Sequence, residues 1–284
     1  MSSARAEGVD TVQSRMFERV KQSIKANATL KRLALWSVRL AGAYGGIANV
    51  SGIARYVRFI REWQQFHHAG GVADVLDWHP CLYDRTLTTG IDAHYFYQAV
   101  WAFRQIFTKN IRHHIDIGSQ VNLVGLLSVV TRVTFLDIRP LVLTLPGYSG
   151  LGASLVALPF ADSTVDSLSS LHVIEHIGLG RYGDPVDPQG TSKAAMEITR
   201  VMAPGGCAYI SVPIGRTRVQ FNGQRVFAAN DVVAMFPGLQ LVTMAMVDAR
   251  GRYRDDVKPG DADIGEVGAG SDCGLGLFLF RKPA

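Results

Sequence analysis

The 284-residue chain has the composition of a soluble globular protein, with 48% hydrophobic and 19% charged residues. Its three cysteines, Cys81, Cys207 and Cys273, are widely spaced. This spacing argues against a disulfide framework and a CxxC zinc site and favours a reducing compartment. No signal-peptide pattern follows Met1, so a cytoplasmic location is expected.

The formal net charge of +5 is concentrated near the N-terminus. Up to Phe66 there are eleven Lys and Arg residues against four Asp and Glu residues, so the remainder of the chain is slightly acidic. Because that remainder lacks the basic bias that nucleic-acid binding requires, we expect no nucleic-acid partner.

Apolar residues at helical spacing predict helices over residues 11–26 and 30–66. Residues 33–54 are nearly uncharged apart from Arg39, and a central Arg costs about 2.5–3.5 kcal/mol on membrane-insertion scales. We favour helices packed on the main domain or on a partner subunit, as in a homo-oligomer. A basic helix in peripheral membrane contact is the next alternative, and a membrane span the least favoured.

A further helix, rich in aromatic residues, is predicted at His94–Phe107. It either packs against the domain that follows or covers a substrate opening, and we favour packing. We therefore expect an N-terminal helical extension or lid at residues 1–108 and a second domain at residues 109–284.

From Ile111 onward, short apolar runs alternate with helical patterns. Strands are expected from Ile111 and at residues 133–138, 152–157, 165–171, 207–213, 239–247 and 274–280, and helices at residues 122–130, 192–202 and 230–235. This alternation predicts an α/β fold with a Rossmann-like, doubly wound sheet of seven mostly parallel strands and helices on both faces. The last two strands have no helix between them, which predicts an antiparallel hairpin at one edge.

The first predicted strand ends in Asp116-x-Gly118, and the second ends in Asp137 about twenty residues later. This is a nucleotide-binding layout, in which the second acid bonds ribose hydroxyls and the glycine lets the backbone approach the ligand. Gln120 and Asn122 stand where a dinucleotide site has glycines, which disfavours NAD.

The stretch Leu158–Gly190 contains a predicted buried strand that runs into polar residues. Ligands of open α/β sheets bind outside the carboxyl ends of the strands. The candidates placed there are His172, Glu175, His176, Arg181, Tyr182 and Asp184. A histidine can take a proton from a hydroxyl near neutral pH, but each histidine could equally be a structural one bonded to a backbone group.

Two further groups of polar residues lie outside this stretch. Arg216, Asn222 and Arg225 follow the fifth strand and suit either an anionic acceptor or ordinary solvated charge. The adjacent pairs His67-His68 and His113-His114 are interpreted as non-ligands, and no metal-ligand set is predicted.

The segment LPFADSTVDSLSSLHVIEHI, followed by a helix, Pro-Gly-Gly and a strand, resembles the class I S-adenosylmethionine-dependent methyltransferases. The resemblance runs from about Ile111 to the C-terminus and implies S-adenosyl-L-methionine as cofactor. It implies the following cofactor-binding residues: Asp116, Gly118, Ser119 and His172 at the methionine part, Asp137 and Ile138 at the ribose, and Ser154 and Leu155 at the adenine. Ser154 departs from the Asp that is common there.

A narrower resemblance is carried by EHIGLGRYGDPVDPQG, VPIGRTRVQFNGQRVF, DIGS and LDIRP, which are similar to the domain of unknown function 268 family. That family is regarded as methyltransferase-like, and its members often accompany genes for glycan assembly. The resemblance implies no particular reaction or acceptor.

Together these patterns favour a methyltransferase that methylates an oxygen of a sugar, glycan or related small molecule. The expected catalytic residues are His176, Glu175, Arg181, Tyr182 and Asp184, and the expected substrate-binding residues are Arg216, Asn222 and Arg225. The alternative is a catalytically silent methyltransferase-fold protein that acts as a binding or scaffold partner in glycan assembly. NAD-dependent sugar oxidoreduction is disfavoured by the missing glycines.

Overall fold

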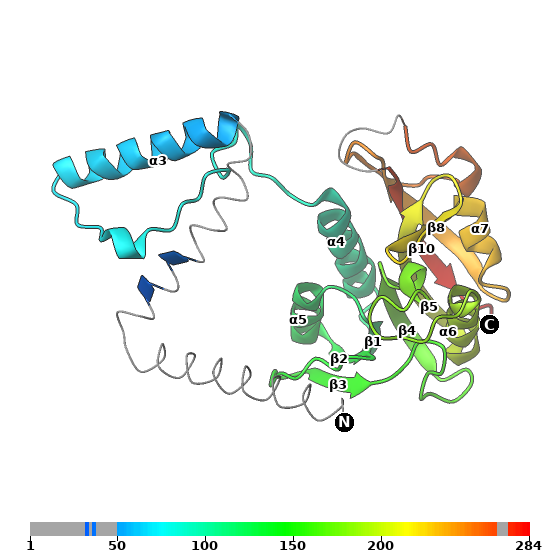
Figure 1. Ribbon diagram of the computed structural model, residues 1–284. Coiled ribbons are helices and arrows are strands. Elements are labelled where there is room, and N and C mark those ends of the chain that lie inside the picture. The colour runs from blue at the N-terminus through cyan, green and yellow to red at the C-terminus, as the bar shows by residue number, and fades with distance from the viewer. Residues whose placement is uncertain (1–31, 34–35, 38–49, 266–271) are drawn as a thin grey trace, which may run out of the picture. The chain divides into compact units, whose positions relative to one another are not determined.

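The computed structural model describes residues 32–33, 36–37, 50–265 and 272–284 (Figure 1). The chain divides into two compact units, residues 1–90 and residues 91–284. The helix predicted at 11–26 and most of the first half of the one predicted at 30–66 lie outside the described residues. Among the helices that are described, none has the length and apolar character needed to cross a membrane.

In the first unit, helix α3 (Val50–His68) is followed by a loop that packs back onto it. Trp78 on the loop contacts two aromatic rings of the helix edge-on, with centroids 5.1 Å from Trp63 and 5.3 Å from Phe59. Trp63 Nε1 also donates to the carbonyl of Ala73 at 3.1 Å. Partly buried aromatic contacts of this kind stabilise a small helix–loop unit beyond what helix propensity provides.

The second unit begins before the boundary that we expected at residues 108/109, because helix α4 (Ala93–Thr108) belongs to it. The Asp92 side chain caps this helix by accepting from the Tyr95 backbone N–H at 3.2 Å. On the inner face, buried Gln98 accepts from Ser211 Oγ at 2.8 Å, and Trp101 lies edge-on to Tyr209. The helix is therefore packed against the sheet.

The central sheet has the order β3-β2-β1-β4-β5-β10-β8-β9. Its strands are β1 (His113–Ile117), β2 (Arg132–Asp137), β3 (Tyr148–Gly152), β4 (Val165–Leu171), β5 (Met202–Ile214), β8 (Gln240–Val247), β9 (Tyr253–Arg254) and β10 (Gly274–Arg281). The expected Rossmann-like, mostly parallel sheet is confirmed. The expected antiparallel hairpin is confirmed as well, since β8 and β10 pair antiparallel toward one edge of the sheet. Strand β10 lies between β5 and β8, and two-residue β9 adds an eighth strand at that edge.

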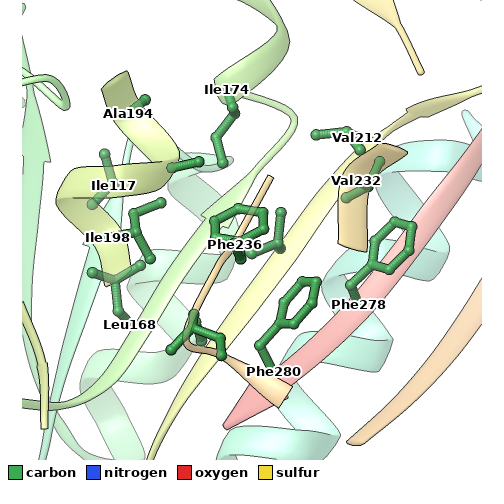
Figure 2. Close-up of a cluster of buried hydrophobic side chains, with 14 of the residues drawn as sticks. Ile117, Leu168, Ile174, Ala194, Ile198, Val212, Val232, Phe236, Phe278 and Phe280 are labelled. Atoms are coloured by element: carbon green, nitrogen blue, oxygen red, sulfur yellow. The ribbon is translucent and has the colours of Figure 1, made fainter. Parts of the chain in front are cut away.

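Helices cover both faces of this sheet (Figure 1). Helix α4 and helix α5 (Val121–Val130) lie on one face, and helices α6 (Gly190–Val201) and α7 (Ala229–Ala234) lie on the other. Figure 2 shows the second interface, where Ile198 of α6 meets Leu168 of β4 and Phe236 meets Phe280 of β10. Burying each large apolar side chain contributes about 1.5–3 kcal/mol, so the two faces hold the strand ends in a fixed arrangement.

The third strand was expected at residues 152–157, and this position is wrong. Strand β3 pairs with β2 from Tyr148 to Gly152, and it is an exposed edge strand with two glycines, so its sequence carries a weak strand pattern. The apolar residues that follow form a turn, closed by a bridge between Ser154 and Ala157. The apolar character of this turn reflects the burial of Leu155 in the core, and the turn is not a strand of the sheet.

Candidate functional site

A pocket lies at the carboxyl ends of β1, β2 and β4, with a volume of about 880 Å³ that includes the solvent at its opening. This is the usual size and place of a ligand site in a doubly wound sheet. The predicted residues that line it are Gly118, Asp137, Ile138, Ser154, Leu155, His172, His176, Tyr182 and Asp184. The structure thus brings predicted cofactor-binding residues and predicted catalytic residues together at one cavity.

Gly118 keeps the pocket open beside Asp137. Its φ of +64° is a left-handed conformation that favours glycine. A Cβ at this position would lie 3.3 Å from the Val173 methyl groups and 3.5 Å from Asp137 Oδ2. Asp137 Oδ1 accepts from the backbone N–H of Arg139 at 2.7 Å, and its other oxygen, Oδ2, therefore faces the gap that Gly118 leaves.

Arg139 also lines the pocket, although it is not among the site residues predicted from the sequence. Its Nε lies 3.5 Å from Asp137 Oδ1, and its guanidinium lies 4.3 Å from the centre of the Tyr182 ring. Arg181 contacts the same ring at 5.0 Å. These contacts connect the acid at the end of β2 to the loop that follows β4.

Asp116 and Ser119 lie beneath the pocket and do not line it. Asp116 Oδ1 accepts from the Ser119 backbone N–H at 3.1 Å, and its Oδ2 accepts from Ser169 Oγ. Ser119 Oγ in turn accepts from the Leu171 backbone N–H at 3.2 Å. This network ties the loop after β1 to β4, so these residues shape the site without being placed to contact a ligand.

Burial raises the pKa of Asp116 to about 6, although hydrogen bonds from Ser169 and Ser119 oppose the increase. His114 lies between Ser167 and Ser169, 2.8 Å from each hydroxyl. Its burial lowers its pKa to about 3, so it is neutral and lends no positive charge to the network. The Asp116 carboxylate is therefore held at a cost in free energy at neutral pH.

This cost predicts a pH dependence of stability. The pKa of Asp116 is higher in the folded protein than its ordinary value of 3.8, so its stabilising contribution is present at low pH and is lost as pH rises through about 6. Between pH 4.5 and 7 the loss is on the order of 2 kcal/mol. Asp116→Asn removes this titration. Urea unfolding at pH 4.5 and at pH 7 measures the free energy of unfolding of both proteins. Between these pH values the wild type should lose about 2 kcal/mol more than the variant. The same pH dependence in both proteins would contradict the prediction.

A sharp turn after β4 brings two histidines and a glutamate together. His172 adopts a left-handed φ of +61°, and residues Ile174–His176 form a single 3₁₀ turn. Glu175 is completely buried. Its Oε1 is hydrogen-bonded to His172 Nδ1 and lies 3.7 Å from His176 Nε2. Tyr95 of α4 stacks on the His172 ring at 5.4 Å, so α4 also contributes to the site.

His176 is held by a backbone carbonyl from a different part of the chain. Its Nδ1 lies 2.7 Å from the oxygen of Gly223, in the turn between the short strands β6 (Arg218–Gln220) and β7 (Gln224–Val226). Because a carbonyl only accepts, Nδ1 carries the proton and Nε2 keeps its lone pair. Burial lowers the pKa of His176, so the ring is neutral near pH 7.

The loop from Gly178 to Gly190 is braced by its own acids. Asp184 accepts from the Gly178 backbone N–H at 2.6 Å and from that of Tyr182 at 3.3 Å. Asp187 accepts from the Gln189 backbone N–H and from Lys193 Nζ. Both carboxylates are therefore already engaged, although each lines the pocket.

The predicted substrate-binding residues Arg216, Asn222 and Arg225 do not line the pocket. Arg225 is 8% exposed, and its guanidinium faces four backbone carbonyls. It donates to Ile177 at 2.6 Å, to Glu175 and Pro188 at 3.5 Å, and to Asp187 at 3.4 Å. The structure thus gives Arg225 a bracing position beneath the loop, and Arg216 is exposed.

Several solved structures have a similar architecture. The N-methyltransferase NodS from Bradyrhizobium japonicum WM9 is 14% identical, with a TM-score of 0.46 over 68% of this chain and 98% of its own. The 1,6-didemethyltoxoflavin-N1-methyltransferase from Burkholderia thailandensis, solved with S-adenosylhomocysteine, is 12% identical, with a TM-score of 0.46 over 81% and 89%. The [4+2]-cyclase SpnF is 13% identical, with a TM-score of 0.43 over 66% and 81%. Since similarity at this level accompanies different activities, it does not assign one to this chain.

The match to a sequence family is more specific. No curated protein matches the chain. Residues 159–255 match the model of the family described as "Caenorhabditis protein of unknown function, DUF268". This segment contains the turn after β4, the braced loop and the β6–β7 turn. The resemblance to the domain of unknown function 268 family, expected from the sequence, is therefore confirmed over residues 159–255.

Proposed function

We propose that this protein is an S-adenosylmethionine-dependent methyltransferase whose cofactor occupies the pocket beside Gly118 and Asp137. The supporting observation is a carboxylate at the end of β2 with one oxygen facing a glycine-lined gap. The sheet order also differs from the 3-2-1-4-5-6 order of dinucleotide-binding sheets by the inserted antiparallel strand β10.

The residues present fit such a cofactor. Asp137 Oδ2 would accept from the ribose hydroxyls, and the apolar turn around Leu155 and Val156 would hold the adenine. The methionine part would lie near His172, above the network of Asp116 and Ser119. When bound, S-adenosylmethionine supplies an electrophilic methyl group on sulfur.

The acceptor side of the site suits a hydroxyl group. His176 Nε2 has its lone pair free for a proton, because Nδ1 is fixed as a donor to Gly223. Glu175 is placed to orient the two histidines, and Tyr182 and Arg139 add polar groups to the pocket wall. We therefore propose O-methylation of a sugar, glycan or related small molecule, with Asp184, Asp187 and Arg225 bracing the loop that shapes the acceptor side.

Calorimetric titration of the full chain tests the proposal. We expect S-adenosylmethionine and S-adenosylhomocysteine to bind one per chain with micromolar dissociation constants, and NAD to give no heat, because the glycines of a dinucleotide site are missing. Absence of S-adenosylmethionine binding at millimolar concentration would reject methyl transfer and favour a catalytically silent binding or scaffold protein.

A further inference from the structure

The turn after β4 gathers one potential metal ligand from each of His172, Glu175 and His176, and these ligand atoms all lie within 4.8 Å of one another. His172 and His176 both line the pocket, and Glu175 lies behind them, fully buried. The sequence alone did not predict this group. A spacing of three and four residues is common on helices, and only the left-handed His172 and the 3₁₀ turn direct all three side chains to one point.

Two observations indicate that this cluster lacks a partner. Glu175 Oε2 is buried and has no hydrogen-bond partner within the part of the chain that the structure describes. A buried carboxylate oxygen left unpaired is costly, and a cation is its usual partner. No Lys or Arg side chain forms an ion pair with Glu175 among the described residues.

The second observation is the orientation of His176. Histidines that bind metals usually donate their other ring N–H to a carboxylate or a backbone carbonyl, which fixes the tautomer. His176 has this arrangement: Nδ1 donates to the Gly223 carbonyl at 2.7 Å, and Nε2, the nitrogen with the lone pair, lies 3.7 Å from Glu175 Oε1. Arg181 donates to the same carbonyl at 2.9 Å, so its charge lies on the side of the ring away from Nε2.

We propose that His172, Glu175 and His176 bind a divalent transition-metal ion in the wall of the pocket. Two imidazole nitrogens and one carboxylate oxygen suit Zn²⁺ and its first-row neighbours, whereas Mg²⁺ and Ca²⁺ prefer oxygen ligands. Binding of the ion would replace the hydrogen bond between His172 Nδ1 and Glu175 Oε1, and the proton of that bond would leave to solvent.

Three protein ligands leave at least one coordination position open toward the pocket. In a methyltransferase, and therefore resting on the proposed function, this position receives the acceptor hydroxyl. The metal would lower the pKa of a bound hydroxyl, whose proton would leave to solvent. The acceptor oxygen would then bond to the methyl carbon as the bond from that carbon to the cofactor sulfur breaks, and S-adenosylhomocysteine would be the leaving group. With the ion bound, the Nε2 lone pair of His176 is a metal ligand, and this role replaces the base role that His176 has in the metal-free site.

The test uses the full chain, first freed of metal with a chelator. Zn²⁺ is titrated in competition with a chromophoric chelator, and Co²⁺ is added separately to record its visible absorption bands. We expect one Zn²⁺ per chain, and at least tenfold weaker binding in both Glu175→Gln and His176→Gln. His94→Gln is the matched control, because the His94 ring lies 6.1 Å from that of His172 but outside the cluster, and it should bind Zn²⁺ as the wild type does.

Binding of less than one Zn²⁺ per chain, or equal affinity in wild type and both cluster variants, would overturn the proposal. Circular dichroism of each metal-free variant shows whether it folds. If Glu175→Gln does not fold, the zinc affinity of His176→Gln is the measurement that decides the proposal. S-Adenosylmethionine is titrated into the metal-free protein in parallel. Cofactor binding without a zinc site would overturn the metal proposal alone, and zinc binding without cofactor binding would overturn the proposed function alone.

Discussion

Replacing Asp137 with Asn is expected to raise the dissociation constant of S-adenosylhomocysteine about 100-fold. Its free oxygen, Oδ2, faces the pocket, while Oδ1 is already engaged by the Arg139 backbone N–H. Hydrogen bonds to a charged acceptor contribute about 1.5–3 kcal/mol each, and about 3 kcal/mol corresponds to a factor of roughly 100 in affinity. Calorimetric titration of the variant measures this change directly.

Asp166→Asn is the matched control for this experiment. Asp166 is an exposed residue of β4 that does not line the pocket, so this substitution removes the same charge without touching the site. Cofactor affinity in this variant should stay within about twofold of the wild type. If Asp137→Asn also binds with wild-type affinity, the cofactor does not contact the end of β2 and our placement of it is wrong.

The second large effect is expected for Arg225→Met, which should lower the free energy of unfolding by about 3 kcal/mol or more. The substitution keeps much of the side-chain length but removes the Arg225 donor from the carbonyls of Glu175, Ile177 and Pro188, and from that of Asp187, which keeps the Gly190 backbone N–H. Each buried acceptor left unpaired costs about 1–3 kcal/mol. For a unit of this size, the midpoint of thermal unfolding should fall by roughly 6–12 °C, which calorimetry can measure.

Two further variants separate bracing from charge. Arg216→Met removes an exposed arginine from the same region and should change the midpoint by about 1–2 °C at most. Arg225→Lys keeps the charge, but a single ammonium group cannot reach all of the carbonyls that the two ends of the guanidinium face. It should therefore be more stable than Arg225→Met but less stable than the wild type. A fully stable Arg225→Met variant would show that the arginine is available for an acceptor, as the sequence had suggested.

Much of the sheet could be predicted from the sequence because its central strands are buried on both faces. Strand β4 was placed correctly at Val165–Leu171, because the apolar residues Val165, Leu168 and Leu171 stand in a short segment bounded by turn residues. Edge strand β3 was misplaced because its exposed residues carry no such pattern. The position of β10 between β5 and β8 also could not be predicted, because strand order depends on pairing and not on any local pattern.

The candidate site was predicted in part for a similar reason. Residues at the carboxyl ends of strands, such as Asp137 and His172, can be assigned from the element pattern alone. The roles of residues around the loop could not be assigned in this way. In the sequence, Arg225 and Arg216 are both arginines that follow β5, and only the structure shows that Arg225 is buried against backbone carbonyls. Arg139 was missed because its significance lies in its contact with Tyr182, a residue forty-three positions later.

The carbonyl of Gly223 joins two segments that lie far apart in the sequence. It fixes His176 and Arg181, while Arg225, two residues later, supports the loop between them from beneath. The segments EHIGLGRYGD and FNGQRVF, which are separated by helix α6 and strands β5 and β6, are thus held together by direct hydrogen bonds. Exchanging either segment alone for that of a relative would therefore break these hydrogen bonds, so a chimaeric protein should fold well only when the two segments are exchanged together.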